Sequence, residues 1–164
     1  MSWLRTGGPR DPYVEAPIPP GESVIGTWTG SGIRKIPVTG MKVILTNKSL
    51  ILSPLDVSGA VKLFELFSKF VKEFALPLAV VKEGLEQTQL QKVISIPLNA
   101  IRSAAAGNGP QLFRPPTVLI TMDDGSQYLI GILRAILSAN IDPRNTLPRD
   151  EFLKALQGAI AASR

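Results

Sequence analysis

The chain has 164 residues, of which 45% are hydrophobic and 19% are charged, a composition typical of one folded domain. It contains no cysteine and no histidine, which excludes disulfides, thiolate nucleophiles, zinc-thiolate sites and any mechanism of the Ser-His-Asp or Cys-His kind. Eighteen Lys and Arg residues against thirteen Asp and Glu give a net charge of +5, which suits anionic partners, although the charges are dispersed along the chain.

Residues 1–21 are rich in proline and glycine, which predicts an N-terminal arm with extended, unpaired backbone. The arm is either disordered or held against the domain surface by Tyr13, Val14 and Ile18. The first residues contain no apolar stretch of signal-peptide length, so we expect a cytoplasmic protein, with the inner face of the membrane as an alternative location.

β-Favouring residues predict a first strand over residues 22–29, which ends in a turn at Gly30-Ser31-Gly32. Residues 33–38 have no clear assignment. Two β-favouring runs at 42–46 and 49–53 meet at one polar turn, which predicts a hairpin. Strict alternation would place Met41, Val43 and Leu45 on one face of it.

The hydrophobic period changes after residue 58, where we expect a helical insertion that extends to residue 91. Apolar residues from Ala60 to Phe74 recur at helical spacing, and a second, shorter helix is expected over 78–91. The apolar face of the first helix carries four of the six phenylalanines in the chain, Phe64, Phe67, Phe70 and Phe74.

This phenylalanine stripe has to be buried, because full exposure of four such side chains would forfeit about 6 to 12 kcal/mol. Three surfaces remain open for it. The stripe packs on the sheet of its own domain, on another subunit or partner, or shallowly in a membrane surface, where neighbouring lysines would contact anionic lipid.

Strand signals return at 92–96 and from Ile101 onward, and a second hairpin is predicted from 118–122 and 127–133. Its turn contains Asp123 and Asp124, which we assign to turn chemistry and not to a metal. A final helix is expected over 148–162, with a proline in its first turn and two acids favoured by the helix dipole. Its apolar stripe comprises Phe152, Leu153, Leu156, Ala159 and Ile160.

Seven strands followed by one helix is an order that resembles the pleckstrin-homology-like (PH-like) superfamily, and within it the GRAM and bacterial PH-domain types. The matching segments are Gly21–Ile25, the hairpin Val43–Leu52, the step Ile96–Ile101, the turn Asp124–Ile130 and the closing helix Arg149–Leu156. The resemblance implies an α+β, mainly β fold, in which about seven antiparallel strands curl into a partly open barrel. The C-terminal helix would plug one end, and the insertion between the third and fourth strands is not part of the family core.

The resemblance also implies a site for an anionic headgroup near the connection of the first two strands. Carried over residue by residue, the cations there are Arg34, Lys35 and Lys42. The first strand lacks the basic residue that phosphoinositide-binding PH domains have at this place.

The acidic residues have no paired spacing in a pocket motif, so we expect no enzyme, no cofactor and no metal site. We expect a binding module that associates with a protein partner or with an anionic membrane surface. The alternative is a structural protein that self-associates through Phe64, Phe67, Phe70 and Phe74. A nucleic-acid partner is not expected, because Trp28 lacks surrounding basic and aromatic residues and is assigned to packing.

Overall fold

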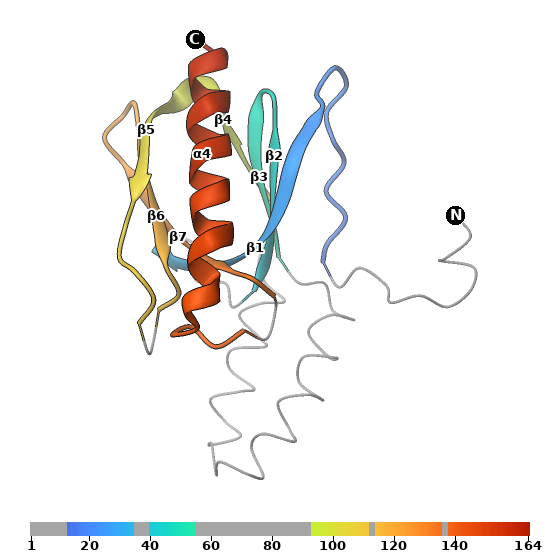
Figure 1. Ribbon diagram of the computed structural model, residues 1–164. Coiled ribbons are helices and arrows are strands. Elements are labelled where there is room, and N and C mark those ends of the chain that lie inside the picture. The colour runs from blue at the N-terminus through green and yellow to red at the C-terminus, as the bar shows by residue number, and fades with distance from the viewer. Residues whose placement is uncertain (1–12, 35–39, 55–92, 112–113, 136–137) are drawn as a thin grey trace, which may run out of the picture.

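The computed structural model describes residues 13–34, 40–54, 93–111, 114–135 and 138–164 (Figure 1). The strands are β1 (Val24–Arg34), β2 (Met41–Thr46), β3 (Ser49–Pro54), β4 (Ile94–Pro97), β5 (Ile101–Ala106), β6 (Thr117–Met122) and β7 (Gln127–Leu133). Two short 3₁₀ helices, η1 (Leu98–Ala100) and η2 (Pro143–Asn145), and the C-terminal helix α4 (Thr146–Ala162) complete the described elements. The predicted insertion at 58–91, with Phe64, Phe67, Phe70 and Phe74, lies outside the described residues.

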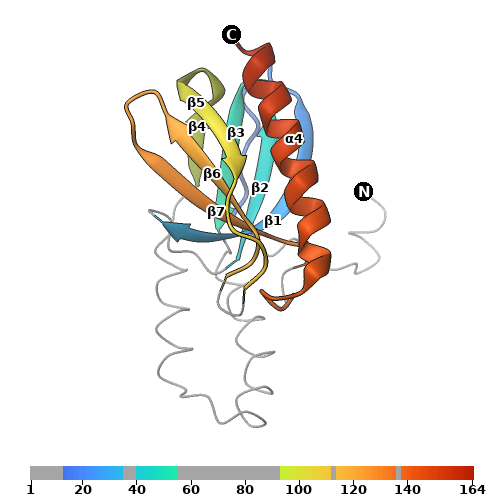
Figure 2. The ribbon, with the colours of Figure 1, turned by 60° about the vertical axis from the view of Figure 1, so that its left-hand side comes forward.

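The seven strands form one sheet in the order β4-β3-β2-β1-β7-β6-β5, and all neighbours are antiparallel. The prediction of a mainly β, antiparallel fold with a C-terminal helix is confirmed. Side chains from both end strands, Ile96 of β4 and Ala104 of β5, belong to one core cluster with Phe152 of α4. The sheet therefore curls around a common core, and α4 lies across its open side (Figures 1 and 2).

The core follows the alternation that the sequence predicts for the first hairpin. Met41, Val43 and Leu45 of β2 are at most 1% exposed and face the core cluster. From α4, Phe152 and Leu156 enter the same cluster with no exposed surface, as the helical stripe requires. Burial of these apolar side chains is the main favourable term in the folding of the domain.

The turn predicted at Gly30-Ser31-Gly32 is wrong, because β1 continues through these residues to Arg34. Gly30 pairs with Met41 of β2 on one side and with Ile132 of β7 on the other. A Cβ atom on Gly30 would lie 2.8 Å from a methyl carbon of Val43, so glycine is needed here for close packing and not for chain reversal.

Helix α4 begins at Thr146, two residues before the predicted start, because η2 leads directly into it. The side chain of Asp142 caps η2 by accepting a hydrogen bond from the backbone N–H of Arg144. Asp150 consequently lies beyond the first turn of α4, and the predicted dipole role for the two acids is wrong. Asp150 instead accepts a hydrogen bond from Arg149 Nε at 2.8 Å.

The turn between β6 and β7 has the predicted chemistry. Gly125 has a φ angle of +86°, which favours glycine, and the carboxylate of Asp124 accepts hydrogen bonds from the backbone N–H and the hydroxyl of Ser126. The Asp124 carboxylate thus serves the turn itself, as an Asx turn does.

Candidate functional site

The two halves of β1 have different neighbours. Its first half pairs with β2, whereas its pairing with β7 begins only at Thr29, which lies opposite Leu133. The N–H of Ile132 donates to the carbonyl of Pro116 at 2.9 Å, so the backbone groups of Ile132 face away from β1. By alternation those of Leu133 face β1, and Thr29 and Leu133 form a hydrogen-bonded pair.

The same alternation places the backbone N–H and C=O of Thr27 on the edge that Thr29 presents to β7. The strand β7 has ended before this point, at Leu133. Within the part of the chain that the structure describes, no strand pairs with β1 on this edge before Thr29. Thr27 therefore presents a donor and an acceptor that no described strand pairs with.

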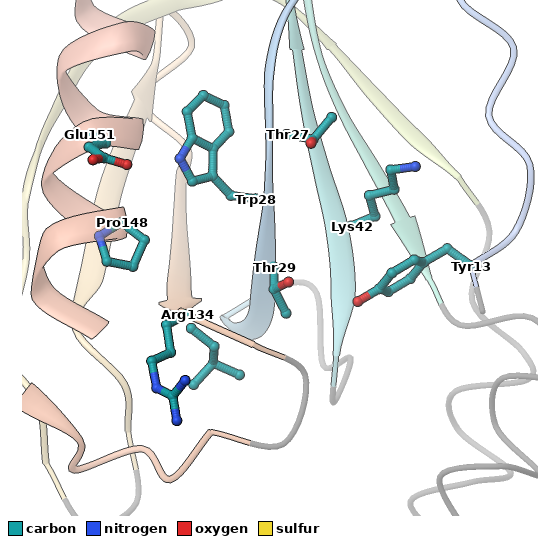
Figure 3. A pocket seen from close by; sticks show the side chains of 9 residues that line it. Tyr13, Thr27, Trp28, Thr29, Lys42, Arg134, Pro148 and Glu151 are labelled. Carbon is teal, nitrogen blue, oxygen red and sulfur yellow. The ribbon is translucent and has the colours of Figure 1, made fainter. Parts of the chain in front are cut away.

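A pocket of about 350 Å³ lies at this open edge, between β1, the end of β7 and the first turns of α4 (Figure 3). Its lining residues are Tyr13, Thr27, Trp28, Thr29, Lys42, Leu133, Arg134, Pro148 and Glu151. Because they come from the arm, three strands and the helix, the pocket is a product of the tertiary fold and not of any local motif.

Trp28 forms the apolar wall of the pocket. Its ring lies edge-on to Phe152, with the centroids 5.1 Å apart, and a Cβ atom on Gly26 would lie 2.6 Å from the ring. The glycine thus makes room for the indole on the surface of β1, and the predicted packing role of Trp28 is confirmed. The side chain is only half-buried, and no described residue accepts a hydrogen bond from its N–H, which is turned toward α4 (Figure 3).

The charged groups of the pocket differ in their pairing. Arg134 Nε lies 3.1 Å from Asp142 Oδ2, and Arg144 Nη2 lies 2.9 Å from the same oxygen, so two cations share one carboxylate. Glu151, which extends from α4 toward the pocket beside Trp28 (Figure 3), is exposed and makes no ion pair with any described residue. A carboxylate beside an aromatic ring, without an ion pair among the described residues, favours a cationic group as ligand.

The segment after β7 is held away from β1 by a polar network. The backbone N–H of Arg134 donates to Asn145 Oδ1 at 2.8 Å, and Asn145 Nδ2 donates to the carbonyl of Ala139 at 2.9 Å. Hydrogen bonds from the side chain and backbone N–H of Arg144 hold the pKa of Asp142 well below its usual range, with a smaller contribution from Arg134. These contacts fix the point at which β7 ends, so β7 does not pair with Thr27.

The edge of β5, on the opposite flank of α4, is covered. Gln157 Nε2 of the helix donates to the carbonyl of Ala104 at 2.9 Å, and Arg164 donates to the carbonyl of Ile101. Near the start of the helix, the buried Arg149 donates to the carbonyl of Thr117 at 3.0 Å. Side chains of α4, and that of Arg164 after it, therefore donate to strand carbonyls on this flank.

A second pocket, of about 570 Å³, lies at the other end of α4 and includes Glu22, Ser49 and Ser163. The carboxylate of Glu22 accepts hydrogen bonds from the hydroxyls of Ser49 at 3.0 Å and Thr46 at 2.9 Å. The carboxylate of this pocket is thus engaged in holding the turn between β2 and β3, in contrast to that of Glu151.

The N-terminal arm contacts the domain at Val14, one of the residues predicted to hold it. The N–H of Val14 donates to the carbonyl of Pro54 at 2.8 Å, and the hydroxyl of Ser53 donates to the carbonyl of Val14. This anchors the arm at the end of β3 and brings Tyr13 to the pocket.

Of the three cations predicted for an anionic headgroup, the structure places Lys42 in the pocket lining. Arg34 is the last residue of β1, and Lys35 lies outside the described residues. Lys42 lies opposite Thr29, five residues before Arg34, which corresponds to roughly 17 Å along an extended strand. The strand register does not bring Arg34 and Lys42 together, and the glycine-rich turn expected beside Arg34 is part of the strand.

Among the described residues, no group of three or more acidic side chains is arranged to hold a metal ion. No described helix is long and apolar enough to cross a lipid bilayer.

Comparison with known proteins identifies no family for this chain. No protein-family model and no curated protein matches the chain. One similar solved structure is the C-terminal domain of an unknown protein from Leishmania infantum, with a TM-score of 0.49 and 10% identity over 86% of both chains. Another is the hSac2 domain of the human phosphoinositide phosphatase Sac2, with a TM-score of 0.46 and 12% identity over 87% of this chain and 74% of the other. Likeness at this level says nothing of a ligand or an activity.

Proposed function

We propose that this chain is a non-catalytic binding module of the PH-like type, which associates with a partner protein at the pocket beside Trp28. The antiparallel order of the strands and the closing helix support the PH-like assignment, in which the curled sheet is a partly open barrel. We further propose a cytoplasmic location, which suits a chain without cysteine.

One observation carries the proposal. The pocket combines a half-buried aromatic ring, a carboxylate without an ion pair and backbone groups of Thr27 without a strand partner, both judged among the described residues. Proteins recognise segments of other proteins by such features. Association with an anionic membrane and self-association through the phenylalanine stripe depend largely on residues outside the described part, so they enter as outcomes of the test.

The test begins with selection of a displayed random-peptide library on the purified protein. Affinities of the enriched peptides are then measured from the fluorescence of Trp28 in a Trp3→Phe background, since these are the two tryptophans of the chain. Gly26→Ala is expected to weaken binding by about tenfold, because the added methyl group displaces the Trp28 ring. Gly158→Ala is the matched control, since its Cβ meets nothing within 4 Å.

Two further measurements give the proposal a way to fail. Co-sedimentation with anionic vesicles at low salt, together with an absence of enriched peptides, would assign the module to membranes. A concentration-insensitive oligomer in light scattering, again without enriched peptides, would assign it to self-association.

A further inference from the structure

We propose, on the basis of the function proposed above, that the partner adds an extended strand to β1 at Thr27 and inserts an Arg or Lys side chain between Trp28 and Glu151. The ligand is thus a basic, extended peptide segment. The edge of β1 supplies the hydrogen bonds and the pocket supplies the preference for a cation.

The position of the added strand follows from the register of β7. Leu133 forms a hydrogen-bonded pair with Thr29, so a strand that continues the line of β7 forms the next such pair at Thr27. Thr27 would then donate its N–H and accept at its C=O, which are the groups left without a strand partner among the described residues. Strand addition of this kind obtains affinity from main-chain bonds and specificity from alternate side chains.

The chemistry of the key side chain follows from the same register. The peptide residue opposite Trp28 has its side chain on the face of β1 that carries the indole, about 5 Å away. That face looks toward α4, where Pro148 and Glu151 form the opposite wall of the pocket (Figure 3). A Lys or Arg at this position would contact the ring and approach the uncompensated carboxylate of Glu151.

The choice of a cation over an anion depends on which charges lie beside the Trp28 ring. The guanidinium of Arg134 is turned away from the ring and contacts Asp142, and Lys42 lies on the other side of β1 from the ring (Figure 3). On the Trp28 side, the charge without an ion pair among the described residues is that of Glu151. Charge complementarity therefore favours a basic segment, even though the whole chain has a net charge of +5.

The test uses the full chain and four pools of fluorescent heptapeptides, whose central residue is Arg, Lys, norleucine or Glu and whose other positions are randomised without proline. The Arg and Lys pools are expected to bind about tenfold more tightly than the norleucine pool, and the Glu pool most weakly. Glu151→Gln should remove most of this advantage. Asp150→Asn is the control, because Asp150 pairs with Arg149 and does not line the pocket.

Strand addition is tested separately. Thr27→Pro removes the outward N–H but leaves the ladder with β2 intact, and it should weaken the Arg pool by about tenfold, whereas Thr27→Ala should not. Peptides N-methylated at alternate residues probe the same bond without any change to the protein. Methylation of the peptide residues whose N–H groups face β1 is expected to abolish binding. Methylation of the residues between them is expected to preserve it.

The outcomes separate the inference from the function on which it rests. Equal binding of all four pools, or an unchanged Arg advantage in Glu151→Gln, would overturn the cation site and leave a peptide-binding module. Tolerance of both methylation phases would overturn strand addition. If no pool binds the wild-type chain, both proposals fail. A stable oligomer in light scattering would in that case assign the chain to self-association.

Discussion

Two strand edges flank helix α4, and they differ in whether side chains cover their backbone groups. On the β5 flank, Gln157 and Arg164 donate to strand carbonyls, so the edge is closed by side chains. On the β1 flank, no described strand pairs with Thr27, and its backbone groups face a pocket instead. A free strand edge invites unwanted association. An edge left open beside a closed one therefore supports the proposal that a partner strand covers it.

The contrast also separates stability from binding. The contacts that hold α4 to the sheet lie in the core and on the β5 flank, whereas the pocket residues Thr27 and Glu151 are exposed and contribute little packing. Substitutions on the closed flank should therefore affect the free energy of unfolding, and substitutions that remove the N–H of Thr27 or the carboxylate of Glu151 should affect binding.

The largest effect on stability is expected from Phe152→Ala. Phe152 is fully buried in the core cluster that contains Ala104 of β5 and against which Trp28 of β1 packs. The lost burial and the cavity should lower the free energy of unfolding by about 3 to 5 kcal/mol, measured by urea denaturation. Leu147→Ala is the control on the same helix, since Leu147 is 66% exposed and the expected change is within about 0.5 kcal/mol. A loss below about 1 kcal/mol for Phe152→Ala would contradict a shared core.

A smaller effect is expected from Arg149→Met, which keeps the bulk of the side chain but removes its donors to the carbonyl of Thr117 and to Asp150. Loss of a buried, charge-assisted hydrogen bond should cost about 2 kcal/mol in the same assay. Lys154→Met, at an exposed position of α4, is the matched control. Equal stability of the two variants would mean that Arg149 does not tie the helix to the β5 flank.

The sequence predicts the elements of this fold better than their pairing. The alternation in residues 41–53 and the helical stripe that contains Phe152 and Leu156 are local patterns, so the hairpin, the helix and their buried faces are predicted correctly. Gly30 is misread, because a glycine required by close strand packing has the same sequence signal as one required by a turn.

The open edge itself leaves no local signal. It exists because β7 ends at Leu133, and that end depends on contacts of Arg134 with Asp142 and Asn145, eight and eleven residues away. The nearest hint in the sequence is Gly26 two residues before Trp28, a spacing that allows an indole to lie over the strand. Glu151 is recognisable as a helix acid, but its role at the pocket follows only from the packing of α4 on β1.

Gln157→Ala should open the β5 edge and make it resemble that of β1. The carbonyl of Ala104 would lose its side-chain donor, at an expected cost of about 1 kcal/mol in the free energy of unfolding. Urea denaturation of Gln157→Ala and Lys154→Ala, both at exposed positions of α4, isolates the hydrogen bond from the change in helix propensity. No difference between the two variants would show that the β5 edge does not depend on this donor.

The smallest effect concerns pH and the network that ends β7. The hydrogen bonds from Arg144 hold the pKa of Asp142 below its usual range in the folded chain, whereas an unfolded Asp has a pKa of about 3.9. A lowered folded pKa stabilises the native state fully above the unfolded pKa, and this stabilisation is lost as the pH falls through the folded value.

The wild type should therefore lose stability more steeply than Asp142→Asn between about pH 5 and pH 2, and the two urea midpoints should converge in acid. Arg144→Met should flatten the wild-type curve in the same range, because it removes the side-chain donor that lowers the pKa most. Parallel curves for all three proteins would mean that the ionised carboxylate does not stabilise the network that keeps the β1 edge open.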